Sequence, residues 1–295
     1  MDKWVVYILL AVCLSSCGQA SGNKQVKQGT DSLQNDTVVS HPVDSLAYAY
    51  LKSGRIMYEN GDKLGAIAKY NKAIEIDPLY MLAYYNRGLS KSKIGDNQGA
   101  IDDYSKAIQI NPQYIKAYFS RGLIKSKLGD NKEAIVDYSK AIQINPQYIK
   151  AYFNRGNCKS KLGDKEGAIS DYNKAIELDA QNINAYINLG VEKYELGDYE
   201  GEIATYRLAI KNCSPDADLY NNLGRALYDP KRFKEAAEAY GEGIKAFPND
   251  GKLYYGRGLA RNRLGDKNGA CEDWHRSSEL GCLQANALLL LCGEK

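Results

Sequence analysis

Histidine and cysteine are the side chains best suited to acid–base catalysis, metal binding or nucleophilic attack, and this sequence has few of them. Its 295 residues contain two histidines and seven cysteines. His41 lies in a polar stretch, and His275 follows Trp274 without a nucleophile at a matching spacing. The sequence contains no Cys-x-x-Cys pair, no His-Glu-x-x-His motif and no G-x-x-x-x-G-K-S/T phosphate loop. It therefore predicts a protein that is not an enzyme and that holds no metal and no cofactor.

One of the cysteines, Cys17, ends a short apolar segment near the N-terminus. The run from Trp4 to Leu14 follows a lysine and has about half of the roughly 20 residues of a membrane-spanning helix, which is the size of a signal-peptide core. The sequence Leu-Ser-Ser-Cys-Gly around Cys17 resembles the lipobox of bacterial lipoproteins. The resemblance implies a signal peptide over residues 1–16 and lipid on Cys17. It also implies a bacterial cell-envelope protein that is lipid-anchored to a membrane, the outer membrane being favoured, with its folded part on the periplasmic or outer side. The alternative is an ordinary signal peptide that happens to contain this cysteine.

Composition and charge narrow the class of partner. The chain carries 39 Lys and Arg against 36 Asp and Glu, a formal charge of +3, and this near balance provides no broad basic field for nucleic acid.

Residues 17–46 are rich in Gly, Gln, Asn, Ser and Thr and show no apolar period, so they cannot bury enough surface to offset chain entropy. We expect residues 17–46 to be a flexible tether between lipid and fold.

The rest of the chain repeats with a period of 34 residues. The segment from Tyr104 to Phe119 recurs without change from Tyr138 to Phe153. Sliding this period along the chain gives seven units, at residues 47–80, 81–114, 115–148, 149–182, 183–216, 217–250 and 251–284. Each unit predicts two helices. In the third unit we expect a helix over 116–128, a turn at Gly129-Asp130-Asn131, and a second helix that ends before Asn145-Pro146.

The spacing of small and bulky residues within each unit resembles the tetratricopeptide repeat (TPR) family. With positions counted from the first residue of a unit, the family pattern asks for a bulky residue at 4, Gly at 8, Ala at 20, an aromatic at 24, Ala at 27 and Pro at 32. The third unit supplies these as Tyr118, Gly122, Ala134, Tyr138, Ala141 and Pro146. The resemblance implies an all-α, right-handed superhelical solenoid of seven helical hairpins. Residues 285–295 are predicted to form a capping helix and tail, with Leu288 to Leu291 covering the open end.

In the TPR family, positions 2, 5, 6, 9, 12 and 13 of the first helices face a concave groove. At position 6 four units carry an asparagine, which is similar to the asparagine ladder of the O-linked N-acetylglucosamine transferases, where amides hold an extended peptide. The simpler interpretation is that these asparagines are inherited by duplication and are merely solvated. The expected groove residues are the position 6 amides Asn86, Asn154, Asn188 and Asn222, the apolar position 5 residues Tyr85, Phe119 and Phe153, and the lysines Lys116, Lys150, Lys127 and Lys161 at positions 2 and 13.

The expected partner is a protein, through a peptide segment or a partner helix that enters this groove. A basic middle stretch flanked by Glu59, Glu195 and Asp229 favours an acidic segment. The alternative function is binding of envelope carbohydrate or cell wall, for which the aromatic residues at position 5 would have to act as exposed platforms.

Two further pairings follow from residue spacing. Cys271 stands where the first five units have isoleucine, a position that faces the next first helix, and Cys292 would sit there at the small position 8, so we expect a disulfide between them. Arg at position 7 and Asp at position 23 occur together in units two, three, four and seven and are absent together from the others. We therefore expect four ion pairs of architectural role, each within one hairpin: Arg87 with Asp103, Arg121 with Asp137, Arg155 with Asp171, and Arg257 with Asp273.

Overall fold

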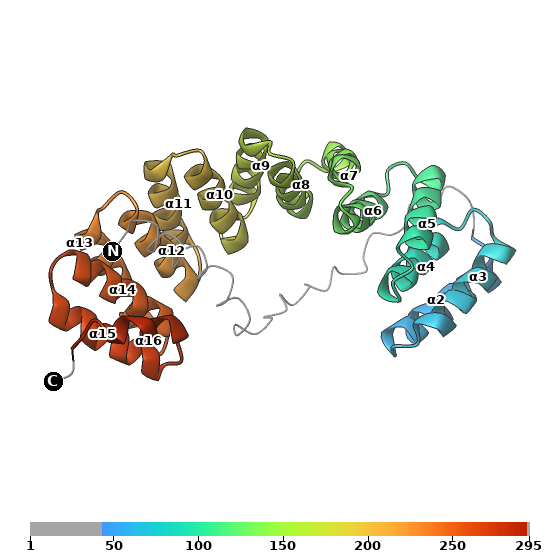
Figure 1. The fold of residues 1–295 in the computed structure, drawn as a ribbon. Coiled ribbons are helices and arrows are strands. Elements are labelled where there is room, and N and C mark those ends of the chain that lie inside the picture. Colours follow the sequence, from blue (N-terminus) through green and yellow to red (C-terminus); the bar gives the residue numbers. More distant parts are fainter. Residues whose placement is uncertain (1–42, 294–295) are drawn as a thin grey trace.

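The computed structural model describes residues 43–293, and these fold into fifteen α-helices with no strand among them. The helices form an arch in which the first helix of each hairpin lies on the inner side and the second on the outer side (Figure 1). The predicted all-α solenoid is therefore confirmed. The hairpins are α2 (Ser45–Glu59) with α3 (Lys63–Ile76), α4 (Met81–Lys93) with α5 (Asn97–Ile110), α6 (Ile115–Leu128) with α7 (Asn131–Ile144), α8 (Ile149–Lys161) with α9 (Lys165–Leu178), α10 (Ile183–Glu195) with α11 (Tyr199–Asn212), α12 (Ala217–Tyr228) with α13 (Phe233–Ala246), and α14 (Gly251–Arg263) with α15 (Lys267–Glu279); α16 (Leu283–Leu289) follows.

Local sequence explains the turn inside each hairpin. In the third unit Gly129 ends α6 with φ +93°, a left-handed conformation that glycine adopts without steric cost. The next residue caps the second helix, and in five hairpins an aspartate at this place accepts a hydrogen bond from the backbone N–H three residues later, as Asp96 does from Gly99 at 2.9 Å. Unit six departs from this pattern because Lys231 takes the left-handed position, with φ +65°.

The core of each hairpin depends on one close approach. A Cβ added to Gly122 would lie 2.8 Å from the ring of Tyr138, and one added to Gly258 would lie 2.5 Å from the indole of Trp274. Glycine at position 8 therefore lets the large ring at position 24 lie against the backbone of the first helix. The alanines at positions 20 and 27, such as Ala134 and Ala141, are fully buried where the two helices meet.

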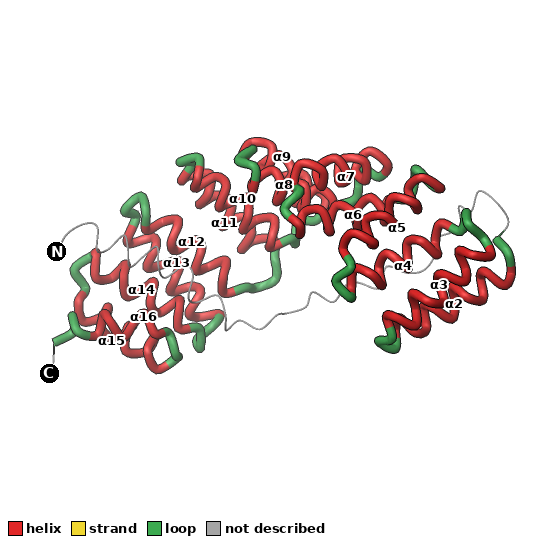
Figure 2. The backbone as a smooth tube through the Cα atoms, turned by 45° about the vertical axis from the view of Figure 1, so that its right-hand side comes forward, coloured by secondary structure: helices red, strands yellow, loops and turns green. Residues whose placement is uncertain are grey.

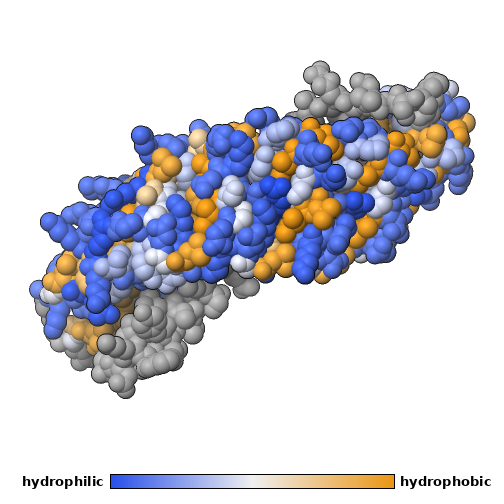
Figure 3. Space-filling model, turned by 90° about the horizontal axis from the view of Figure 1, so that it is seen from above, coloured by the Kyte–Doolittle hydropathy of each residue, from blue (hydrophilic) through white to orange (hydrophobic). Residues whose placement is uncertain are grey.

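Hairpins stack on one another along the arch. Consecutive helices lie side by side and are joined by short loops (Figure 2). Figure 3 shows the outer side of the arch, which is the upper side in Figure 1. On this face hydrophobic residues are scattered among hydrophilic ones. No helix within residues 43–293 is both long enough and apolar enough to cross a membrane.

The C-terminal cap differs from expectation. Helix α16 starts at Leu283 and ends at Leu289, and Leu288 and Leu289 pack against the cluster around Trp274. Because the helix ends there, the next two leucines lie in a turn, with Leu290 87% and Leu291 59% exposed. The prediction that all four leucines close the stack was therefore wrong for Leu290 and Leu291.

Candidate peptide-binding groove

The inner face of the arch is lined by the first helices (Figure 1). Along the middle units the lysines at position 13 are exposed: Lys93, Lys127 and Lys161. Lys150, at position 2, is also exposed, and Lys116 is half-buried.

The asparagines at position 6 are not four equivalent amides. Asn86 donates from Nδ2 to the carbonyl oxygen of Leu82 at 2.7 Å, and Asn154 donates to that of Lys150 at 2.8 Å. The residue four positions earlier on a helix lies directly beneath such a side chain, so its carbonyl is the nearest acceptor. Asn188 instead donates to Oδ1 of Asn157 in the preceding unit, at 2.8 Å. In units two and four one amide N–H is therefore engaged within the helix, and the oxygen and the second N–H remain for a ligand.

Position 6 loses its amide in unit seven for a steric reason. A Cβ added to Gly256 would overlap the ring of Tyr240 from unit six. Asn222, in unit six, is half-buried. The asparagine stripe thus stops where an aromatic ring fills the space that the side chain would need.

The aromatic residues at position 5 contribute to the packing between hairpins. Tyr85 lies edge-on to Tyr114, with ring centroids 5.1 Å apart, and Phe119 lies in the same way against Tyr148 at 5.2 Å. Phe153 contacts Tyr172, with centroids 6.0 Å apart. Each of the three position 5 rings is half-buried. They line the groove with a partly covered ring rather than with an open aromatic face.

The arginine–aspartate pairs have closely similar geometry in four units. Each arginine donates from Nη2 to Oδ1 of its aspartate at 2.6 Å and from Nε to Oδ2 at 2.9–3.0 Å, and the aspartate side chains are 1–4% exposed. Both partners belong to one hairpin, as the paired change of positions 7 and 23 predicted. The pairs are Arg87–Asp103, Arg121–Asp137, Arg155–Asp171 and Arg257–Asp273.

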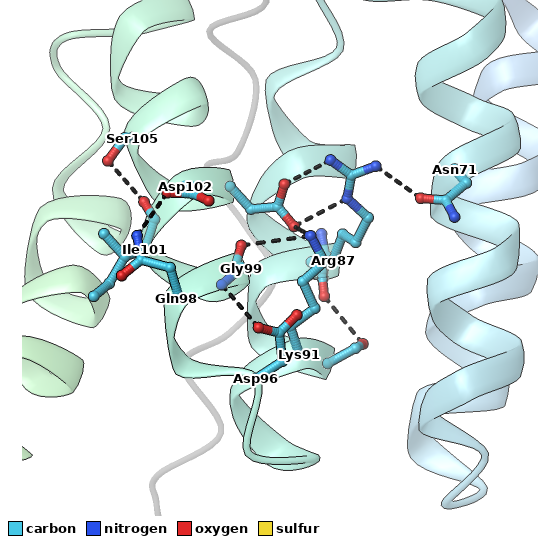
Figure 4. Close-up of polar contacts among 12 residues, drawn as sticks. Asn71, Arg87, Lys91, Asp96, Gln98, Gly99, Ile101, Asp102 and Ser105 are labelled. Atoms are coloured by element: carbon cyan, nitrogen blue, oxygen red, sulfur yellow. Dashed lines mark hydrogen bonds and ion pairs between the residues drawn. The ribbon is translucent and has the colours of Figure 1, made fainter. Parts of the chain in front are cut away.

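Sequence reasoning missed two more contacts of these arginines. A second cation at position 11 approaches the same carboxylate, as Lys91 does at 2.9 Å from Oδ2 of Asp103. The arginine also reaches the preceding unit, since Arg87 donates from Nη1 to Oδ1 of Asn71 on α3 at 2.7 Å (Figure 4). The expectation that the arginines act only within a hairpin was thus incomplete. A partial signal existed. These four units carry Lys or Arg at position 11, namely Lys91, Lys125, Lys159 and Arg261, although unit five has Lys193 there without the pair.

Comparisons with known proteins agree with this geometry. Models described as TPR repeat or tetratricopeptide repeat match residues 54–95, 92–129, 124–163, 149–182, 183–214 and 221–276. The chain belongs to the tetratricopeptide repeat family. No curated protein matches it.

Several solved TPR structures share the fold. A tetratricopeptide repeat protein from Parabacteroides merdae is 20% identical with a TM-score of 0.57, and the match covers 84% of this chain and 99% of that one. MamA is 25% identical with a TM-score of 0.52, over 54% of this chain and 93% of its own. YrrB, described as a TPR protein with an unusual peptide-binding site, is 18% identical with a TM-score of 0.51, over 63% of this chain and 96% of its own. These likenesses show that the chain shares the TPR fold.

A disulfide closes the end of the TPR array. Cys271 on α15 is bonded to Cys292 after α16, and their Cα atoms are 5.6 Å apart, within the ordinary range for a disulfide. Within the described part of the chain, Cys158, Cys213 and Cys282 do not form disulfides.

A buried carboxylate marks the junction of units five and six. Glu202 occupies position 20, where the other six units have alanine, and its side chain is 1% exposed. Its Oε1 lies 3.4 Å from Nη2 of Arg225, while Oε2 has no hydrogen-bond partner among the described residues. Burial raises the pKa of Glu202 from its usual 4.5 to about 7, against the lowering effect of Arg225. The groove therefore has a titratable group beneath it near neutral pH.

Proposed function

We propose that this TPR protein is a membrane-anchored scaffold that holds an extended segment of a partner protein in its concave groove. The observation that carries the proposal is the inner stripe of units two to four, where exposed lysines alternate with amide oxygens and half-buried rings. Such a surface can contact the backbone of a peptide whatever its sequence, while the lysines favour acidic side chains.

The partial burial of the position 5 rings favours a peptide over a carbohydrate. A sugar ring stacks on an open aromatic face, whereas Tyr85 and Phe119 are half-buried and each has a tyrosine ring roughly perpendicular to it, with centroids 5.1 and 5.2 Å away. A peptide needs only apolar edges and hydrogen-bond groups, which this surface offers.

The anchor in this proposal is lipid on Cys17, which lies outside the described residues. The polar residues that follow would give the arch freedom to reach partners near the membrane. Replacing Cys17 with serine should move the protein from the membrane to the soluble envelope fraction and abolish the acyl mass of the N-terminal peptide. Full retention at the membrane would contradict the anchor and leave the groove proposal standing.

Site-specific photo-crosslinking in cells tests the groove. A crosslinking amino acid at Asn154, on the inner face, should capture a discrete protein product, because position 6 would lie against the bound segment. The same amino acid at Lys140, exposed on outer helix α7, is the matched control. Equal products from the two sites, or none from Asn154 in a folded protein, would refute groove binding.

A further inference from the structure

The groove of unit five contains a polar pocket of about 260 Å³ that the repeat pattern does not account for. It lies between α8 and α10 over α9, and its lining is polar apart from Val191: the other residues are Asn157, Ser160, Lys161, Tyr172, Asn188 and Glu192. We propose that this pocket is a subsite for one lysine or arginine side chain of the bound segment, with Glu192 as its counter-ion. This inference rests on the proposed function.

The carboxylate of Glu192 is the unusual group in this pocket. Glu192 is 3% exposed, and its Oε2 has no hydrogen-bond partner in the described part of the chain. The same position holds small or apolar residues in the other six units: Ile56, Ser90, Ile124, Cys158, Ala226 and Ala260. Burying a carboxylate without a donor is costly, so its presence indicates a group that arrives with the ligand.

Two neighbouring donors in the pocket bond to Asn157. Oδ1 of Asn157 accepts hydrogen bonds from the hydroxyl of Tyr172 and from Nδ2 of Asn188, both at 2.8 Å. Neither of these hydrogen bonds reaches Glu192. Lys161 also lines the pocket, and its side chain is exposed. The oxygens of the Glu192 carboxylate, the Asn188 amide and the Ser160 hydroxyl can accept hydrogen bonds from a ligand that donates them.

Size and charge favour a cationic side chain over water. The pocket is several times larger than the roughly 30 Å³ that one water molecule takes up in the liquid. A lysine ammonium or an arginine guanidinium would supply the missing donor and neutralise the buried charge, which a neutral donor does not do.

The charge of the groove changes sign beside this pocket. Position 13 carries Lys161 in unit four but Glu195 in unit five and Asp229 in unit six. A segment with acidic residues over units two to four and one basic residue at unit five would match both halves. Glu192 would then fix the register of the segment along otherwise similar repeats.

Selection from a random library of 12-residue peptides on the full-length chain tests this subsite. The wild type should enrich peptides that combine acidic residues with one lysine or arginine. Replacing that basic residue with glutamine should weaken binding at least tenfold, about 1.4 kcal/mol, in fluorescence anisotropy.

Two Glu192 variants should abolish this difference. Glu192→Gln keeps the shape of the side chain, and Glu192→Ala installs the residue that units six and seven carry at the same position, so it should fold. Glu166→Gln, exposed on outer helix α9, removes an equal charge away from the groove and should leave the difference intact. Circular dichroism checks folding of each variant.

The outcomes separate the two proposals. The selected peptides could carry acidic residues and show no preference for a basic residue, or they could show a basic preference that Glu192→Gln does not change. Either result overturns the subsite and leaves the groove function in place. A pocket that takes only water gives the first result. A wild-type chain that selects no peptide at all overturns both.

Discussion

Glu202 offers the sharpest test of how the array is built, because one substitution restores the repeat pattern at that position. In Glu202→Ala the buried carboxylate is replaced by the residue that fills position 20 in the other six units, where alanine is fully buried. We expect the variant to be more stable than the wild type at pH 8 and to lose this advantage at pH 5.

The sign follows from the raised pKa of Glu202. Below pH 4.5 the group is protonated in both the folded and the unfolded chain. Between 4.5 and about 7 the unfolded chain gives up the proton while the folded chain keeps it, so the free energy of unfolding falls as pH rises and then stays level.

The magnitude is set by the pKa difference between the two states. A rise from 4.5 to about 7 corresponds to about 3 kcal/mol at most. About a third of the Arg225 side chain is exposed, so solvent screens part of the electrostatic effect on Glu202. We therefore expect the stability difference between the variant and the wild type to change by about 1–2 kcal/mol between pH 5 and pH 8. The variant also loses buried methylene groups, but this loss is the same at both pH values and cancels when they are compared.

Hydrogen exchange is the suitable assay, because a repeat array can unfold unit by unit. At each pH the protection of the α11 and α12 amides in Glu202→Ala is divided by that in the wild type. We expect this ratio to be about tenfold higher at pH 8 than at pH 5. Glu200→Ala, which removes a 77% exposed side chain from the same helix, should show no such pH dependence. An equal effect of Glu202→Ala at both pH values would refute the reasoning.

Three other substitutions test separate features of the array. Asp137→Ala leaves Arg121 and Lys125 without their carboxylate and should lower the free energy of unfolding, measured in urea, by about 3 kcal/mol. The double variant Arg121→Leu with Asp137→Thr copies unit five and should lower it clearly less. Equal losses would contradict an ion pair. Lys231→Gly relieves a left-handed residue and should raise the free energy of unfolding by about 1 kcal/mol, while no gain would show that the turn is unstrained. Cys292→Ser should leave groove binding unchanged but make the C-terminal segment a site of rapid proteolysis, and unchanged cleavage would show that packing alone holds α16.

Most of the fold was predictable because the sequence repeats almost without change. The 34-residue period places the first residues of units two to seven at the starts of six helices, from Met81 to Gly251. Paired changes at positions 7 and 23 were sufficient to match Arg87 with Asp103, since two residues that appear and vanish together in a duplicated unit share a contact. Contacts between units were harder to foresee. Arg87 reaches Asn71 because the preceding outer helix lies alongside it, which depends on how hairpins stack.

The candidate groove was predictable in its position but not in its detail. Helical spacing determines which residues line the groove. The acceptor to which an amide donates depends on which acceptors lie nearby, either a backbone carbonyl of its own helix or a side chain of a neighbouring unit. Asn154 bonds the carbonyl of its own helix, and Asn188 bonds the preceding unit because Asn157 stands there where units two, three and seven have leucine. Glu202 and Glu192 are both charges at positions where the other six units have small or apolar residues, so the sequence marks both. That one oxygen of each has no partner among the described residues depends on helix packing and does not follow from spacing.

The departures from the repeat gather in unit five. Position 7 has Leu189 and position 23 has Thr205, so the arginine–aspartate pair is missing, and Lys193 donates to the threonine hydroxyl at 3.0 Å instead. The same unit holds both buried carboxylates with an unpartnered oxygen among the described residues, Glu192 and Glu202. Units one and six also lack the pair but keep the alanine at position 20, so the two changes combine only in unit five. They lie where the groove changes from basic to acidic, which is where a bound segment would need its register fixed.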